Sequence, residues 1–200
     1  MKTKQRGYST RYFVESALMV AIATVLSVLK IDLPFGGGVT LCSMLPIVLN
    51  SHRHGWRWGL ATGFVYGVVQ LLLGLDNVGY AQSAAMAVGV IVLDYVLAYA
   101  VVGLSGFFDE VFPDRRKPTA LAVGIAVTFC LRFLCHYITG VWIWGEWMPE
   151  EFMSLPMTSP WVYSALYNGW YMLAELVLTE AVALALFKPL GSFIRGEDLK

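Results

Sequence analysis

The chain has 200 residues, of which 58% are hydrophobic and 14% are charged, and its mean hydropathy is +0.63. A soluble domain is normally about a quarter charged, so this composition favours an integral membrane protein. The formal net charge is zero, which gives no electrostatic support for nucleic-acid binding, and Cys42, Cys130 and Cys135 have the spacing of neither a zinc site nor a disulfide framework.

The long apolar runs predict an all-α membrane protein with six transmembrane helices in a single domain, residues 1–200. The first run follows a basic N-terminus and is interpreted as a retained helix, because no small-residue cleavage site of a signal peptide follows it. The second run is short and contains Pro46, which predicts a kinked or incompletely spanning helix. The expected spans are 12–29, 39–52, 58–75, 81–107, 119–145 and 161–187.

The positions of the basic residues orient this bundle. Twelve of the 14 lysines and arginines lie at the two chain ends or in the breaks at 51–57 and 109–118. Basic residues concentrate on the cytoplasmic side of membrane proteins, so both termini are predicted to be cytoplasmic. The other breaks then face outward and carry mainly acidic residues, namely Asp32, Asp76, Glu146, Glu150 and Glu151.

Small residues recur every four positions in the first and third spans. The third contains Gly59, Gly63 and Gly67, and the first contains Ala17 and Ala21. This spacing places small side chains on one helix face and lets two helices approach closely. For the glycines we expect packing within the bundle. For the alanines the spacing alone leaves two possibilities, the same packing or a docking face for another membrane protein.

The fourth span contains a carboxylate at membrane depth, Asp94, about 16 Å from the outer end at 1.5 Å per residue. One interpretation is a structural ion pair with Arg132 in which each group neutralises the other. The other is that Asp94 faces a cationic or amine-bearing ligand with Arg132 nearby, because a water-excluded carboxylate attracts a cation strongly.

The fifth span contains Arg132, His136, Gly140 and Trp144 at i, i+4 spacing, so these residues form one stripe on the helix. A charged group at this depth costs at least ~2.5–3.5 kcal/mol and usually has a partner or a function. A flat cation stacked on Trp144 would gain ~0.5–2 kcal/mol. Gly140 would let a planar ligand approach the backbone closely.

The sixth span begins outside the membrane, with Tyr163 and Asn168 in its first two turns. Together with Gln70, Asp94 and the fifth-span stripe, they predict a pocket that opens outward. Glu175 and Glu180 lie in the inner half of the span, where we expect polar packing contacts or groups near the cytoplasmic surface. The alternative is a proton relay of a stand-alone secondary transporter.

One motif of an enzyme class occurs in the chain and a second is absent. Residues 103–106 read Gly-Leu-Ser-Gly, as in membrane serine proteases, but Ser105 is expected at the inner end of its span and His136 in the outer half of the next. The two groups would be too far apart to hydrogen-bond. The chain also lacks a P-loop motif for ATP. Neither motif therefore predicts an enzymatic activity for this chain.

Several segments together resemble the thiamine-specific substrate-binding (S) components of energy-coupling factor transporters. The similar segments are Gly-Gly-Gly-Val-Thr-Leu-Cys-Ser-Met-Leu-Pro-Ile at 36–47, Gly-Leu-Ala-Thr-Gly-Phe-Val-Tyr-Gly at 59–67, Leu-Asp-Tyr-Val-Leu-Ala-Tyr at 93–99, the stripe from Arg132 to Trp144, and Tyr163 with Asn168. They occur in the same order and cover nearly the whole chain.

This resemblance implies a six-helix bundle in the plasma membrane of a prokaryote that binds thiamine near its outer face. It implies that Asp94 and the following Tyr95 contact the charged or amino-bearing part of the ligand. Members of the family vary between Asp and Glu at the first position, and between Lys and Arg at the position of Arg132. His136 and Trp144 match a histidine and a ring-stacking tryptophan.

The remaining expectations from the resemblance concern the last helix and the partners. Tyr163 and Asn168 complete the thiamine site, with Gly140 inside the fifth-span motif. Ala17 and Ala21 match an Ala-x-x-x-Ala motif that docks on the transmembrane coupling subunit, which favours the docking interpretation. Two partner ATPases supply the energy, so the chain itself needs neither an ATP motif nor a cofactor.

Overall fold

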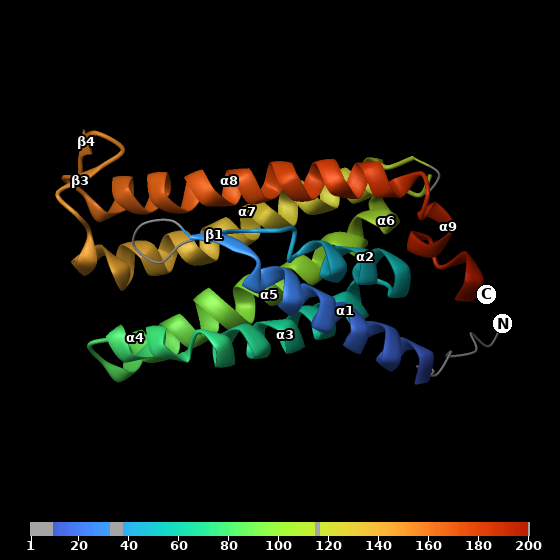
Figure 1. Ribbon diagram of the computed structural model, residues 1–200, viewed down its shortest axis with the longest axis horizontal. Helices are drawn as coiled ribbons and strands as arrows, with labels where there is room; N and C mark the ends of the chain where they lie inside the picture. Colours follow the sequence, from blue (N-terminus) through green and yellow to red (C-terminus); the bar gives the residue numbers. More distant parts are fainter. Residues whose placement is uncertain (1–9, 33–37, 115–116, 200) are drawn as a thin grey trace.

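Long apolar helices run along the longest axis of the molecule (Figure 1). In the computed structural model, which describes residues 10–32, 38–114 and 117–199, four helices are long and apolar enough to cross a membrane. They are Thr10–Val28, Ala84–Val111, Thr119–Trp142 and Pro160–Phe187. The first, fourth, fifth and sixth predicted spans are therefore confirmed as apolar helices, with ends that differ by a few residues.

The second predicted span, 39–52, is only partly helical, which fits the incompletely spanning alternative but not the predicted bounds. Residues 38–40 form strand β2 (Gly38–Thr40), and only α2 (Leu45–His54, ten residues) is helical. Ten residues rise about 15 Å, half of a bilayer core. Pro46 lies in the first turn of α2, where its missing N–H is tolerated, so it begins the helix instead of kinking it.

The third predicted span is α3 (Trp56–Leu73), a helix of 18 residues. It contains Arg57 and Gln70 and is not among the four helices that are apolar enough to cross a membrane. A count of six spanning helices with both ends cytoplasmic therefore stays a prediction. Part of its basis lies outside the described residues, namely Lys2, Lys4, Arg6, Arg115, Arg116 and Lys200, as do Gly36 and Gly37 of the quoted motif.

The fourth span changes helical geometry along its length. It begins with α4 (Ala84–Gly89), widens into a π-helix, η3 (Val90–Leu97), and tightens through α5 (Ala98–Ala100) into the 3-10 helix η4 (Val101–Phe107) and α6 (Phe108–Val111). π-turns are rare and occur frequently at functional sites. Asp94 and Tyr95 both lie in this widened part.

The last two spans are α7 (Thr119–Trp142) and α8 (Pro160–Phe187), which lie side by side (Figure 1). Short elements join the helices: the antiparallel hairpins β1–β2 and β3–β4, two 3-10 helices and a C-terminal pair. Their bounds are β1 Lys30–Asp32, η2 Leu75–Tyr80, η5 Trp144–Trp147, β3 Glu151–Phe152, β4 Leu155–Pro156, α9 Gly191–Ile194 and η6 Glu197–Leu199.

The glycines of α3 pack against the fourth span, as the sequence predicts. A Cβ atom on Gly59 would collide with the Gly103 carbonyl, one on Gly63 would lie 2.6 Å from the Tyr99 carbonyl, and one on Gly67 would lie 2.8 Å from the Tyr95 carbonyl. Ordinary Cβ contacts are longer than this, so the two helices touch through their backbones. These contacts begin at Tyr95 and fix the backbone that directly follows Asp94.

A polar network closes the end of the bundle where α1 (Thr10–Val28) begins and where α9 and η6 lie. Figure 1 shows α9 at this end of the molecule. The buried Arg53 side chain donates from all three nitrogens: to Glu15 (2.6 and 3.0 Å), to Asp198 (2.7 and 2.9 Å) and to the Phe193 carbonyl (2.7 Å). Its hydrogen bonds hold the pKa of the Asp198 carboxyl well below its usual range. The network ties the C-terminal segment to α1 and α2.

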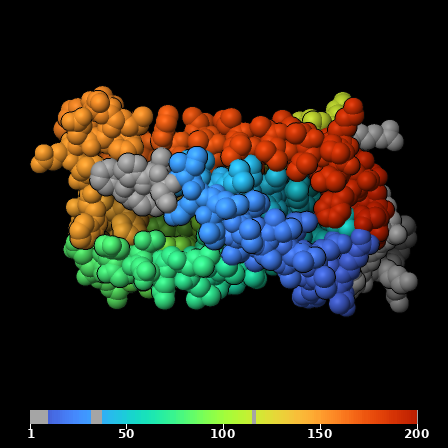
Figure 2. Space-filling model, viewed as in Figure 1, coloured from blue at the N-terminus to red at the C-terminus, as the bar shows by residue number. Residues whose placement is uncertain are grey.

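Helix α1 lies on the outside of the bundle, where much of its surface is uncovered (Figure 2). Only 11% of the most apolar stretch of α1 is buried, against 39% of the corresponding stretch in the fourth and fifth spans. Ala17 and Ala21 are both exposed, whereas Ser16 and Ala23 face inward. The two alanines therefore belong to the uncovered side of α1, and they do not pack within the bundle.

Candidate functional site

Asp94 is the centre of a buried polar cluster between the fourth span and α7. One carboxylate oxygen accepts hydrogen bonds from His136 Nδ1 (3.0 Å) and from the Thr139 hydroxyl, and the other accepts from Trp144 Nε1 (2.9 Å). Asp94 is 9% exposed and Thr139 is fully buried. The sequence-predicted residues Asp94, His136 and Trp144 are thus brought together, with Thr139 as an additional member.

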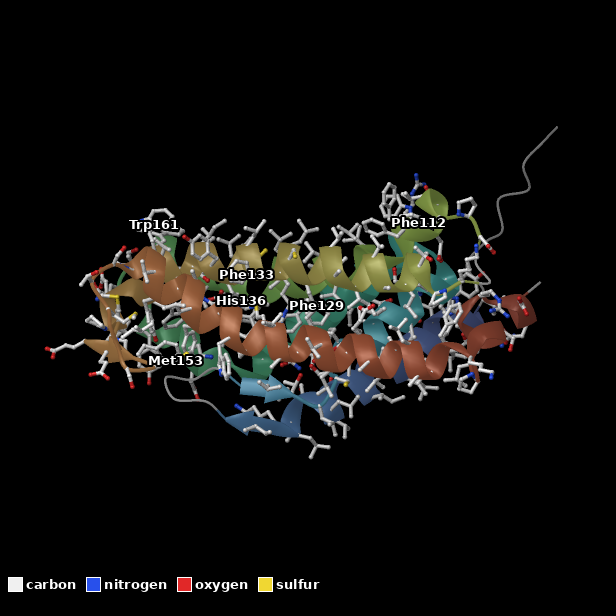
Figure 3. The ribbon with its side chains drawn as sticks, turned by 90° about the horizontal axis from the view of Figure 1, so that it is seen from above. Phe112, Phe129, Phe133, His136, Met153 and Trp161 are labelled. Carbon is white, nitrogen blue, oxygen red and sulfur yellow. The ribbon has the colours of Figure 1, made fainter. Side chains whose placement is uncertain are left out.

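The hydrogen bond to Asp94 determines which ring nitrogen of His136 carries a hydrogen. Because a carboxylate can only accept hydrogen bonds, His136 carries a hydrogen on Nδ1. Its Nε2 atom is buried and has no hydrogen-bond partner among the described residues. Figure 3 shows His136 between α7 and α8, in the half of the molecule that also contains Met153 and Trp161, with Phe112 at the opposite end. This is the half that the predicted topology places outward.

Arg132 lies one turn from His136 but pairs with a different carboxylate. Its guanidinium lies 2.7 Å from Glu175 Oε2 on α8, and it also lies over the ring of Tyr99, 5.2 Å from the centroid. Both members of the pair are at least 94% buried on a side-chain basis. The interpretation in which Arg132 and Asp94 neutralise each other is therefore wrong for this structure.

Glu175 also contacts the chain that leads into α2. Its Oε1 atom accepts hydrogen bonds from the Thr40 amide (2.9 Å) and the Thr40 hydroxyl (2.6 Å). The polar packing contact expected for Glu175 is present, but the sequence did not identify Arg132 and Thr40 as its partners. Helix depth could have indicated the pair with Arg132, because Arg132 is 13 residues from the predicted outer end at 145 and Glu175 is 14 residues from that at 161.

Asn168 holds α8 against α7 beside this cluster. Its amide nitrogen donates to the His136 carbonyl (3.2 Å) and to Ser164 (3.1 Å), and its oxygen accepts from the Tyr171 hydroxyl (3.0 Å). A Cβ atom on Gly140 would collide with the Ser164 hydroxyl and lie 2.9 Å from the Asn168 amide nitrogen. Gly140 therefore makes room for these two side chains.

We expect Gly140→Ala to destabilise the protein by about 1–3 kcal/mol, the usual cost of overpacking, as a lower unfolding temperature in detergent. Ser164→Ala in the same chain should recover most of the loss, since it removes the hydroxyl in the way. Gly169→Ala is the matched control, because a Cβ there meets nothing closer than 3.9 Å. Equal effects at Gly140 and Gly169 would contradict the packing role.

Tyr163 belongs to an aromatic group at the N-terminal end of α8. Its ring stacks on Tyr167 (centroids 5.5 Å apart) and meets Phe152 edge-on (5.7 Å). Tyr163 is 5% exposed. It lies near Asn168 on the same helix, five residues away. The group offers flat aromatic surfaces beside the charged cluster.

Tyr95 is the candidate that the structure places apart from the others. Its hydroxyl donates to the Gly74 carbonyl (2.9 Å) and accepts from Asn77 (2.8 Å), at the junction between α3 and η2. Consecutive helical residues point in directions about 100° apart, which explains why Asp94 and Tyr95 face different neighbours. In this arrangement Tyr95 anchors the fourth span to the end of α3.

Comparison with known proteins gives consistent matches. The family model described as thiamine transporter protein matches residues 13–194. The thiamine transporter ThiT of Bacillus subtilis is 31% identical over 194 residues, which cover 92% of this chain and 94% of that protein. ThiT of Lacticaseibacillus paracasei is 28% identical over 180 residues, 84% of this chain and 83% of that protein.

A solved structure gives the same fold. ThiT from Listeria monocytogenes is similar with a TM-score of 0.74 at 20% sequence identity, and the match covers 92% of this chain and 97% of that one. At this identity the similarity establishes the fold alone. The short α2 and the π-helical fourth span therefore belong to a fold that a known protein shares.

Proposed function

Since this chain belongs to the thiamine transporter protein family, we propose that it captures thiamine at the outer face of a prokaryotic cell membrane as the S component of an energy-coupling factor importer. It is a membrane protein and a transporter component, and partner ATPases hydrolyse the ATP. The alignments with the two thiamine transporters named above cover 92% and 84% of this chain, which supports the same function for it.

The buried Asp94 carboxylate is the observation that carries the proposal. Thiamine has a thiazolium ring with a fixed positive charge and an aminopyrimidine ring. Asp94 is bonded to three donors on side chains that need carry no formal charge, those of His136, Thr139 and Trp144. Its negative charge therefore remains available to a cation or an amino group, and in a water-excluded site that attraction is strong.

The neighbouring residues supply the other contacts that two flat rings need. Trp144 provides a ring face for stacking, and the buried Nε2 of His136 provides a hydrogen-bond acceptor in the neutral imidazole. Arg132, Tyr163 and Asn168 line the same region, with Gly140 and Tyr95 in supporting positions. We assign all eight to the thiamine site.

The membrane arrangement and the docking face complete the proposal. Six spans with both termini cytoplasmic agree with the basic residues at 53, 57, 188 and 195. Ala17 and Ala21 on the uncovered side of α1 form the docking face for the transmembrane coupling subunit. Exposed small residues fit this function because they let another helix approach closely.

Calorimetric titration of the purified protein with thiamine tests the ligand directly. We expect saturable binding at micromolar concentration or tighter, weaker binding of the isolated pyrimidine half and none of riboflavin. Binding of riboflavin or of a precursor in preference to thiamine would assign the chain to another vitamin. The absence of thiamine binding at micromolar concentration would overturn the proposal.

Reconstitution of the chain alone in proteoliposomes tests the need for partners. We expect thiamine binding without accumulation when a proton gradient is applied. Gradient-driven accumulation would instead indicate a stand-alone secondary transporter that uses Glu175 and Glu180, and would contradict the S-component assignment. Addition of the coupling subunit and both ATPases should make uptake depend on ATP.

A further inference from the structure

The buried formal charges of the described residues separate into two groups. Arg53 lies in the network at the terminal end of the bundle, with Glu15 and Asp198 as partners. The other buried charged side chains are Asp94, Arg132 and Glu175. Arg132 pairs with Glu175 and lies one helical turn from His136, which is hydrogen-bonded to Asp94. With His136 neutral, Asp94, Arg132 and Glu175 sum to one negative charge. Without Glu175 the sum would be zero.

Glu175 is the carboxylate that forms the ion pair with Arg132. The two groups are 2.7 Å apart with side chains 3% and 6% exposed, so their attraction is little screened by water. Both oxygens of Glu175 are used, one by Arg132 and the other by Thr40. Asp94, by contrast, is bonded to His136, Thr139 and Trp144, and Arg132 is not among its partners. The arginine charge is thus directed away from Asp94.

This separation has a consequence for which ligands the site prefers. A buried arginine without its own carboxylate would turn toward Asp94 or repel a cation held there. Either response would remove the advantage of a cationic ligand over an uncharged one of the same shape. We infer that Glu175 is a specificity-determining residue that makes the site select a cation, by keeping the charge of Arg132 neutralised. The inference rests on the proposed thiamine-binding function.

The test compares thiamine with deazathiamine, an uncharged isostere in which carbon replaces the quaternary nitrogen. The measured quantity is the ratio of the two affinities, obtained by calorimetry on wild type and on Glu175→Gln. We expect the variant to lower the preference for thiamine roughly tenfold, the effect of one unit charge across about 10 Å at an effective dielectric constant of about 20. Deazathiamine binding should change much less.

A second variant and a matched control keep the result interpretable. Arg132→Gln removes the positive charge while Glu175 keeps its two hydrogen bonds from Thr40, so the preference for thiamine should rise. If Glu175→Gln does not fold, the affinity ratio of Arg132→Gln alone tests the inference. Glu180→Gln, five residues further along the same helix, should leave the ratio unchanged.

The outcomes separate this inference from the function on which it rests. A wild-type protein that does not bind thiamine would overturn the proposed function and the inference with it. A wild type that binds thiamine, with equal losses for both ligands in Glu175→Gln, would leave the function intact and overturn the inference alone. It would show that Glu175 only holds the helices in place. An unchanged or lowered ratio in Arg132→Gln would likewise contradict it.

Discussion

Replacing Asp94 by asparagine should weaken thiamine binding by roughly 100-fold or more, the usual result of truncating one member of a buried charged pair. The substitution keeps the size of the side chain but removes its negative charge. It also replaces one acceptor oxygen by an NH₂ group, which would face donors from His136, Thr139 or Trp144. At least one buried donor then loses its acceptor.

The control for this variant is Asp109→Asn at the opposite end of the fourth span. Asp109 lies 3.0 Å from His52 and takes no part in the Asp94 cluster, so thiamine affinity should stay close to that of wild type. Thermal unfolding without ligand shows whether either variant has lost its fold. A folded Asp94→Asn protein with near wild-type affinity would remove Asp94 from the site.

The sequence was sufficient for the long helices because each carries a continuous apolar run. Depth along the spans was sufficient to bring Asp94 and His136 together, whereas Trp144 reaches Asp94 from η5, beyond the end of α7, and not along a regular helical stripe. The bounds of the second span were mispredicted because apolarity does not distinguish a strand and a ten-residue helix from one longer helix. Pro46 was compatible with either a helix start or a kink.

Partner choice inside the bundle was harder to predict than depth. Arg132 could reach a carboxylate on two different helices, and the rotation of α8 about its axis decides that Glu175 is the one. That rotation depends on side-chain packing between helices, such as Asn168 and Ser164 against Gly140, and no local pattern in the sequence encodes it. The π-helix that contains Asp94 is likewise set by tertiary contacts.

The contact between α3 and the fourth span gives the largest expected effect on stability. A Cβ atom on Gly103 would collide with the backbone of Gly59 and lie 2.6 Å from the Leu60 amide nitrogen. Neither group can rotate away, unlike a side chain, so the helices themselves must separate. We expect Gly103→Ala to cost about 3 kcal/mol or more, at the upper end of overpacking effects, and to lower the unfolding temperature in detergent accordingly.

Alanine substitutions along α3 should follow the closeness of this contact. The loss should be smaller for Gly63→Ala, where the nearest carbonyl is 2.6 Å from the added atom, and smaller again for Gly67→Ala at 2.8 Å. Gly169→Ala on α8 has open space and should be neutral or slightly stabilising, because alanine favours the helix over glycine. An equal loss at all these positions, Gly169 included, would contradict a close backbone contact at Gly103, Gly63 and Gly67.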